Sequence, residues 1–141
     1  MILKKYALLS SALIVLGLPV LASATPVGPL NTSNYTNEVS TVKITSPGSH
    51  YCSASPPFNE FTPAQGHSST TQAQIKSICQ LTGGICTAEV YATSNCDAMH
   101  ALPIAHITIN LDTLVVTLVG KMDNPKYNIV YKNPWTVLIT Y

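Results

Sequence analysis

The sequence contains no arginine, and its charged residues amount to only 9% of the chain, against about a quarter in an ordinary soluble protein. Nucleic-acid binding requires clustered cations that displace the counterions of the phosphate backbone. Of the 7 lysines, two are adjacent at the N-terminus and the other 5 are scattered, so they form no such cluster and we expect no nucleic-acid partner. The same scarcity of positive charge disfavours recognition of an anionic lipid surface. The composition therefore predicts a neutral, polar surface.

Motifs of enzymes and of cofactor sites are also missing. The chain has no G-x-S-x-G nucleophile elbow and no glycine-rich loop of the phosphate-binding kind. Its 6 acidic residues are spread singly, so no local pair of carboxylates is available for acid–base hydrolysis. No catalytic residue and no cofactor is predicted. A binding role is favoured over catalysis, with a small hydrolase as the enzymatic alternative.

The longest apolar run lies at the N-terminus. Two lysines precede residues 6–18, which are apolar, and the small residues Ala22-Ser23-Ala24 follow. A charged segment, an apolar segment and a small-residue cleavage site in this order are typical of a secretory signal. The run is shorter than the ~20 residues that span a bilayer, so no membrane span is expected after cleavage. Residues 1–24 are predicted to be a cleaved signal peptide, and residues 25–141 a single secreted or periplasmic domain.

Four cysteines lie in the predicted mature part: Cys52, Cys79, Cys86 and Cys96. An even number in an exported chain predicts two disulfides, because the compartment is oxidising. A zinc site is disfavoured, since no C-x-x-C pair is present. If residues 85–93 form one extended strand, Cys86 lies about 23 Å from its end, too far for Cys96 to return. Two pairings remain open, Cys52–Cys86 with Cys79–Cys96 and Cys52–Cys96 with Cys79–Cys86.

Hydrophobic spacing predicts one helix, over residues 70–81. Ile75, Ile78 and Cys79 recur at helical spacing, and two glycines follow as a stop. Ser69 and Gln72 have the spacing of a capping box at its start. We therefore expect Cys79 on the buried side of the helix, where a disulfide would attach the helix to the rest of the fold.

Alternation of apolar and polar residues predicts the strands. They are expected over residues 39–45, 85–93, 104–111, 114–119, 127–131 and 136–141. Residues 25–37 are expected to be an extended polar arm, with formal glycosylation sequons at Asn31 and Asn34, and residues 46–68 an irregular segment held by Cys52. The predicted fold is mainly β (α+β): an antiparallel sheet or meander of about five to six strands with one short helix, stapled by disulfides.

Two groups of residues are candidates for binding. Met99, His100 and His106, with Met122 further along the chain, carry thioether and imidazole ligands that suit copper. They make a periplasmic soft-metal binding protein one alternative.

The second group is aromatic and consists of Tyr127, Tyr131 and Trp135. These side chains either cover the sheet or form an exposed platform for a protein or glycan partner outside the cytosol. The terminal strand ending in Tyr141 also fits a structural surface subunit of pilus type that assembles by strand exchange. The leading prediction is a small exported protein with a binding or interaction role.

Overall fold

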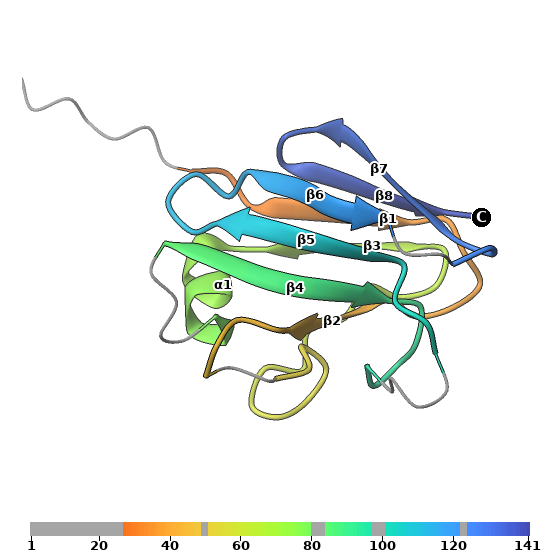
Figure 1. The fold of residues 1–141 in the computed structure, drawn as a ribbon, viewed down its shortest axis with the longest axis horizontal. Coiled ribbons are helices and arrows are strands. Elements are labelled where there is room, and N and C mark those ends of the chain that lie inside the picture. Colours follow the sequence, from red (N-terminus) through yellow and green to blue (C-terminus); the bar gives the residue numbers. More distant parts are fainter. Residues whose placement is uncertain (1–26, 49–50, 80–83, 97–100, 122–123) are drawn as a thin grey trace, which may run out of the picture.

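The computed structural model describes residues 27–48, 51–79, 84–96, 101–121 and 124–141, and the predicted signal peptide lies outside these ranges. The described part contains one helix and eight strands (Figure 1). In chain order they are β1 (Leu30–Asn34), β2 (Thr41–Ile44), β3 (Gly66–Thr70), α1 (Gln72–Ile78), β4 (Ile85–Tyr91), β5 (Ala105–Asn110), β6 (Val116–Lys121), β7 (Asn128–Asn133) and β8 (Thr136–Thr140). The predicted fold class, mainly β with one short helix and two disulfides, is confirmed.

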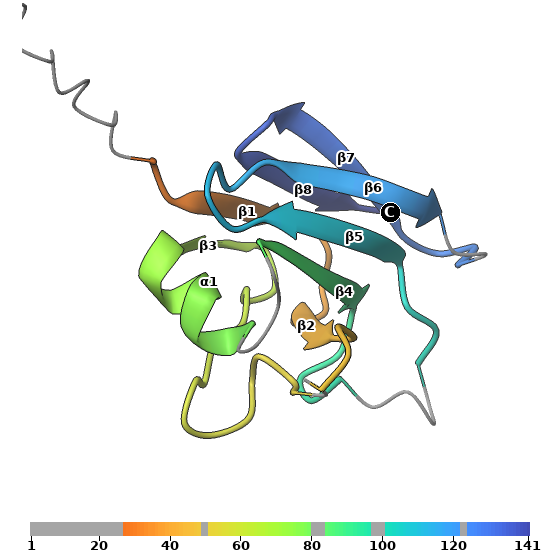
Figure 2. The ribbon, with the colours of Figure 1, turned by 60° about the vertical axis from the view of Figure 1, so that its left-hand side comes forward.

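The strands form two sheets of four strands each. We call the sheet of order β3-β1-β8-β7 the first sheet and the sheet of order β2-β4-β5-β6 the second sheet. Every neighbouring pair is antiparallel except β1 with β8, which is parallel. Buried side chains of both sheets and of α1 belong to one hydrophobic core. The helix lies at one end of the sheets, beside β3 and β4 (Figure 2).

The second sheet follows the alternation of the sequence closely. In β4 the side chains of Cys86, Ala88 and Val90 are buried, and in β5 those of Ile107 and Ile109 are buried opposite them. Strands β4, β5 and β6 are consecutive in the chain and pair in order, which confirms the expected meander for this part. Period-two burial predicts such strands because alternate side chains point to opposite faces of a sheet.

The first sheet corrects three expectations. The predicted polar arm contains β1, and the predicted irregular segment ends in β3. The C-terminal hairpin β7–β8 does not continue the meander but joins β1 in the other sheet. Strand β1 lacks an apolar alternation, since Leu30 is its only large apolar residue, and its backbone is held by pairing with β3 on one side and β8 on the other. The strand count is therefore eight in the described residues, rather than five or six.

The helix begins later and is shorter than expected. Its N-cap is Thr71, whose hydroxyl accepts a hydrogen bond from the backbone N–H of Gln74 (3.3 Å), while the Gln74 side chain accepts one from the backbone N–H of Thr71 (2.8 Å). The capping box is therefore Thr71 with Gln74, and the predicted pair of Ser69 with Gln72 is wrong, because Ser69 belongs to β3. Such a box satisfies two backbone donors that helix geometry leaves without partners.

The disulfides resolve the two pairings that the sequence left open. Cys52 bonds to Cys96, and Cys79 bonds to Cys86. The first ties the segment after β2 to the segment that follows β4. The second ties the end of α1 to β4, as expected for a cysteine on the buried side of the helix. Both disulfides therefore attach neighbouring segments to the second sheet.

Candidate functional site

The three aromatic residues that the sequence singled out have different surroundings. Tyr127 is partly buried against the core and its ring stacks on that of Tyr141, with 5.7 Å between centroids. The hydroxyl of Tyr141 accepts a hydrogen bond from the backbone N–H of Asn37 (2.7 Å). Tyr127 therefore helps to anchor the C-terminus to the segment after β1.

Tyr131 and Trp135 lie on the exposed C-terminal hairpin. Tyr131 is 38% exposed in β7, and Trp135 is 46% exposed in the turn between β7 and β8. The indole N–H of Trp135 donates to the backbone oxygen of Thr113 (2.9 Å), which fixes the ring against the β5–β6 turn of the second sheet. Val130, the neighbour of Tyr131 in β7, is 50% exposed. These three side chains, Val130, Tyr131 and Trp135, are called the β7 surface below.

The β7 surface lies on a free strand edge. β7 pairs with β8 and stands last in the order of the first sheet, so its other edge has no strand partner within the described residues. Val130 and Tyr131 are consecutive, and their side chains therefore point to opposite faces of the strand. Partial burial raises the pKa of Tyr131 above its usual value, so this phenol is neutral and able to donate a hydrogen bond at physiological pH.

The terminal strand is not free. β8 lies between β1 and β7 and pairs with both. Strand exchange through β8 would require it to leave two ladders, so the expected pilus-type use of a terminal strand has no support in this arrangement.

Of the four predicted copper ligands, only His106 belongs to the described residues. Met99, His100 and Met122 lie outside the described residues. His106 lies on β5, where its Nδ1 is 3.6 Å from Oε1 of Glu89 on the neighbouring β4. Among the residues that the structure describes, no group of three or more His, Cys, Asp or Glu side chains is placed to hold a metal ion.

Glu89 is shared between His106 and a buried phenol. Tyr91 is 2% exposed, and its hydroxyl donates a hydrogen bond to the second carboxylate oxygen of Glu89 (2.5 Å). Burial, and then the hydrogen bond to Glu89, raise the pKa of Tyr91 far above its usual value. The contacts among His106, Glu89 and Tyr91 therefore keep the Tyr91 phenol neutral and bonded to Glu89 on the outer face of the second sheet. They give these three residues a structural role.

The structure contains a cavity that the sequence did not predict. It has a volume of about 80 Å³ and lies between strands of both sheets, α1 and the segment after β2. One part of its wall is apolar and consists of Leu30, Val42, Ile44, Ile75, Ile78, Cys79 and Ile109. Another part carries hydroxyl groups, from Thr32, Ser40, Ser53, Thr62, Ser68 and Thr70. Glu60 and the half-exposed Phe61 complete the lining.

The sequence signal for this cavity is a pair of small hydroxyl residues, which only the strand pairing reveals. Thr32 and Ser68 face each other across the β1–β3 pair at inward positions, where a sheet would ordinarily place large apolar side chains. Small hydroxyl residues there leave space in the core. Finding them required the register of β1 with β3, and neither strand was predicted.

The two sequons have different structural positions. Asn34 is 1% exposed, its amide nitrogen donates to the backbone oxygens of Glu38 (2.7 Å) and Pro63 (3.2 Å), and its amide oxygen accepts from the backbone and side chain of Thr36. Asn31 is partly exposed in β1 and donates to the backbone oxygen of Pro29. In the folded protein Asn34 is therefore a structural residue, because its side chain is enclosed and fully hydrogen-bonded.

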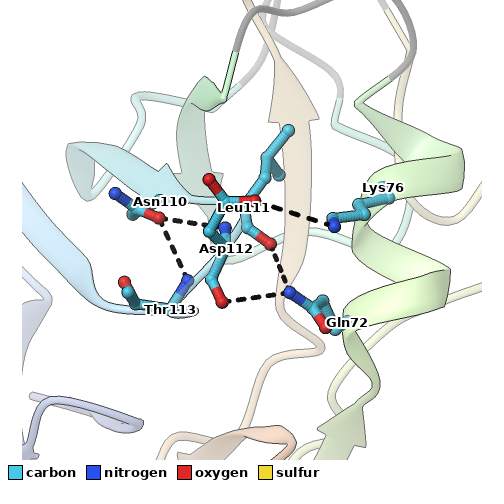
Figure 3. A network of polar contacts seen from close by, with 6 residues as sticks. All are labelled: Gln72, Lys76, Asn110, Leu111, Asp112 and Thr113. Atoms are coloured by element: carbon cyan, nitrogen blue, oxygen red, sulfur yellow. Dashed lines mark hydrogen bonds and ion pairs between the residues drawn. The ribbon is translucent and has the colours of Figure 1, made fainter. Parts of the chain in front are cut away.

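Polar contacts attach α1 to the turn between β5 and β6 (Figure 3). The Gln72 amide donates to the backbone oxygens of Leu111 (2.7 Å) and Asp112 (3.1 Å), and Nζ of Lys76 lies 3.8 Å from the Asp112 carboxylate. The amide oxygen of Asn110 accepts from the backbone of Asp112 and Thr113 and shapes the same turn. These contacts hold the helix over one end of the second sheet, next to the cavity that Ile75 and Ile78 line.

A comparison with solved structures finds a chain of similar fold. The crystal structure of the Legionella pneumophila type II secretion system substrate NttC is similar to this chain, with a TM-score of 0.62 and 21% sequence identity. The similarity covers 82% of this chain and 98% of that one. No protein-family model matches the chain, and no curated protein sequence matches it. At this identity the similarity shows a shared fold.

Among the described residues, no helix is long and apolar enough to cross a bilayer.

Proposed function

We propose that this chain is an exported protein that acts outside the cytosol by binding a protein partner along the free edge of β7. Export is supported by two formed disulfides, which persist in oxidising compartments, together with the charged, apolar and small-residue segments at the N-terminus. NttC, which is described as a type II secretion substrate, shares the fold, and this also favours export.

The observation that carries the binding role is the composition of the β7 surface. Val130, Tyr131 and Trp135 expose 50%, 38% and 46% of their surfaces on one hairpin, beside backbone groups that no strand of the described chain pairs. Large apolar side chains beside a free edge suit strand addition, in which backbone hydrogen bonds give affinity and alternate side chains give specificity. Tyrosine and tryptophan are also the residue types most often dominant in binding energy at interfaces.

The available edge is short. A register shift between Tyr131 and Asn133 interrupts the pairing of β7 with β8, and Lys132 lies at this irregularity. Bulges and lysines on edge strands hinder pairing with another strand, and in a pairing between identical copies both edges would carry this obstacle. We therefore favour a different protein, with an extended segment of its own, over self-assembly.

Site-specific photo-crosslinking tests this proposal. Val130 is replaced by p-benzoylphenylalanine in the protein expressed in its own host, and Val119 is replaced in the same way as a matched control. Val119 is 65% exposed on β6, the end strand of the second sheet, so the two probes are both accessible. We expect a single adduct of defined mass from position 130 and none from position 119. Equal adducts from both positions, or none from either, would rule out a partner at β7.

Export is measured separately, by intact mass of the protein recovered outside the cytosol. A chain that begins at Thr25 and lacks free thiols is the expected product. A full-length, reduced chain confined to the cytosol would contradict export whatever the crosslinking result.

A further inference from the structure

We propose that the cavity between the two sheets binds the branched aliphatic group of a small amine, with the ammonium group at Glu60. This site is independent of the proposed β7 partner. Its lining comes from β1, β2, β3, α1, β5 and the segment that contains Ser53, Glu60, Phe61 and Thr62. None of these residues belongs to β7, and β3, which does line the cavity, is the edge strand at the opposite side of the first sheet.

The size of the cavity limits the group that can enter. Its volume of about 80 Å³ exceeds the ~10–15 Å³ that a cavity needs to hold one water molecule, and falls short of the roughly 150 Å³ cavity that accepts benzene. A branched aliphatic group of the size of a leucine side chain fits between these limits. Phe61, which lines the cavity while 51% exposed, shows that the lining reaches the surface, so a head group can remain at the mouth.

The apolar wall explains the preference for a branched hydrocarbon. Ile75 and Ile78 of α1 and Ile109 of β5 are all at most 6% exposed and contribute to the lining. Each contact with such side chains removes apolar surface from water, at about 25 cal/mol per Å². The Cys79–Cys86 disulfide fixes the end of α1 to β4, so this wall is formed before any ligand arrives. A preformed wall lowers the ordering cost of binding.

The hydroxyl wall supplies the polar groups. Ser53 accepts a hydrogen bond from the backbone N–H of Val42 (3.0 Å), and the Thr62 and Ser68 hydroxyls are bonded to each other (2.6 Å). For Thr32 and Thr70, the structure gives no hydrogen bond from the hydroxyl to any described residue. These two hydroxyls are therefore available to a ligand or to water.

Glu60 sets the charge that the mouth prefers. One of its carboxylate oxygens accepts a hydrogen bond from the side-chain amide of Gln74 (2.8 Å), which orients the group without neutralising it. Among the described residues, no lysine or histidine forms an ion pair with Glu60. The two ion pairs in this part of the chain join Lys76 to Asp112 and His106 to Glu89. A carboxylate at the mouth attracts an ammonium group and repels an acid of the same shape.

Three compounds with one carbon skeleton test the site: 3-methylbutylamine, 3-methylbutanol and 3-methylbutanoate. Each is titrated into the purified, disulfide-bonded protein at pH 7 while the methyl resonances of Ile75, Ile78 and Ile109 are followed by NMR. We expect these resonances to shift together, with the amine binding most tightly and the acid least tightly. A partly exposed ion pair predicts an advantage of the amine over the alcohol of up to about fivefold.

Two variants separate the contributions. Glu60→Gln is expected to remove the advantage of the amine and to leave the alcohol unchanged. Thr32→Ile replaces the hydroxyl by a larger ethyl group that fills part of the cavity, and it is expected to abolish binding of all three compounds. Thr117→Ile, the same change at an exposed position of β6, leaves binding unaltered. Thermal unfolding of each variant verifies that it is folded. Isoleucine methyl resonances that stay still at millimolar ligand, or shifts that persist in Thr32→Ile, would overturn the site; crosslinking at position 130 would be unaffected by either result.

Discussion

The two sheets of this protein are encoded in different ways. In the second sheet, β4, β5 and β6 follow one another in the chain, pair in that order and bury alternate residues. In the first sheet, β1 near the start of the described chain pairs in parallel with β8 at its end. The comparison teaches that a strand with its own apolar alternation is predictable from its sequence, whereas the polar strands β1 and β3, which are held by their pairing, are not.

The inner faces of the sheets differ in chemistry as well. β4 and β5 of the second sheet contribute buried side chains such as Val90, Ile107 and Ile109, while β1 contributes Leu30 and the enclosed amide of Asn34. Apolar burial is proportional to area and tolerates small displacements, but a buried amide is stable only with all its partners in place. The first sheet therefore depends more on specific polar contacts than the second.

The largest expected effect concerns the two disulfides that flank the second sheet. Cys52–Cys96 closes a sequence separation of 44 residues and Cys79–Cys86 one of 7. Loop-closure entropy predicts a loss of about 4 kcal/mol in the free energy of unfolding for Cys52→Ala/Cys96→Ala and about 2.5 kcal/mol for Cys79→Ala/Cys86→Ala. Urea denaturation of the two double variants measures both values. A larger loss from the shorter loop would show that the second sheet depends on α1 more than on chain entropy.

Asn34 tests the polar character of the first sheet. Asn34→Ala removes a side chain that makes four hydrogen bonds and leaves backbone oxygens of Glu38 and Pro63 without these donors. We expect a loss of about 3 kcal/mol in the free energy of unfolding, as for a broken buried network. Asn31→Ala, a change in the same strand at a more exposed residue, should alter stability by less than about 0.5 kcal/mol. Similar losses from both variants would mean that the buried network is unimportant.

Tyr91 gives a pH test on the outer face of the second sheet. Because burial and Glu89 raise the pKa of Tyr91 in the folded protein, the unfolded chain loses this proton first, near pH 10. Above that pH the folded state binds more protons, so stability falls by up to about 1.4 kcal/mol per pH unit from this group. Below pH 10 the contribution is fully present. Denaturation at pH 9 to 11 should show this slope in the wild type and a shallower one in Tyr91→Phe; parallel slopes would place the phenol in contact with water.

The smallest effect concerns the contact between α1 and the second sheet. Gln72→Ala removes two hydrogen bonds to backbone oxygens of the β5–β6 turn and should lower the free energy of unfolding by about 1 kcal/mol. Lys76→Ala removes an ion pair whose side chains are 49% and 79% exposed, so a change of at most a few tenths of a kcal/mol is expected. Thermal denaturation at low and high salt distinguishes them, since only the Lys76 effect should depend on salt. A larger loss of stability from Lys76→Ala than from Gln72→Ala would mean that the ion pair, and not the Gln72 amide, is the main contact between α1 and the turn.

The candidate sites, like the strands, are predictable from the sequence only where the signal is local. Tyr131 and Trp135 could be chosen from the sequence because aromatic residues in a short C-terminal hairpin are conspicuous, and both are exposed. The sequence groups Tyr127 with them, because spacing alone does not show that its ring stacks on Tyr141. The cavity was beyond prediction, because Thr32 and Ser68 meet only through the β1–β3 register.

The sequence by itself determined the fold class, the disulfide-forming cysteines, the helix near Ile75 and Ile78, the strands of the second sheet and the two strands of the β7–β8 hairpin, because periodicity and composition are local properties. The tertiary structure alone decided the pairing Cys52–Cys96 with Cys79–Cys86, the inclusion of β1 and β3 in a sheet, and the space between the sheets. Each of these depends on which distant backbones meet. Polar strands carry no periodic signal of their own, and their hydrogen-bonding groups acquire partners only when the ends of the chain are brought together.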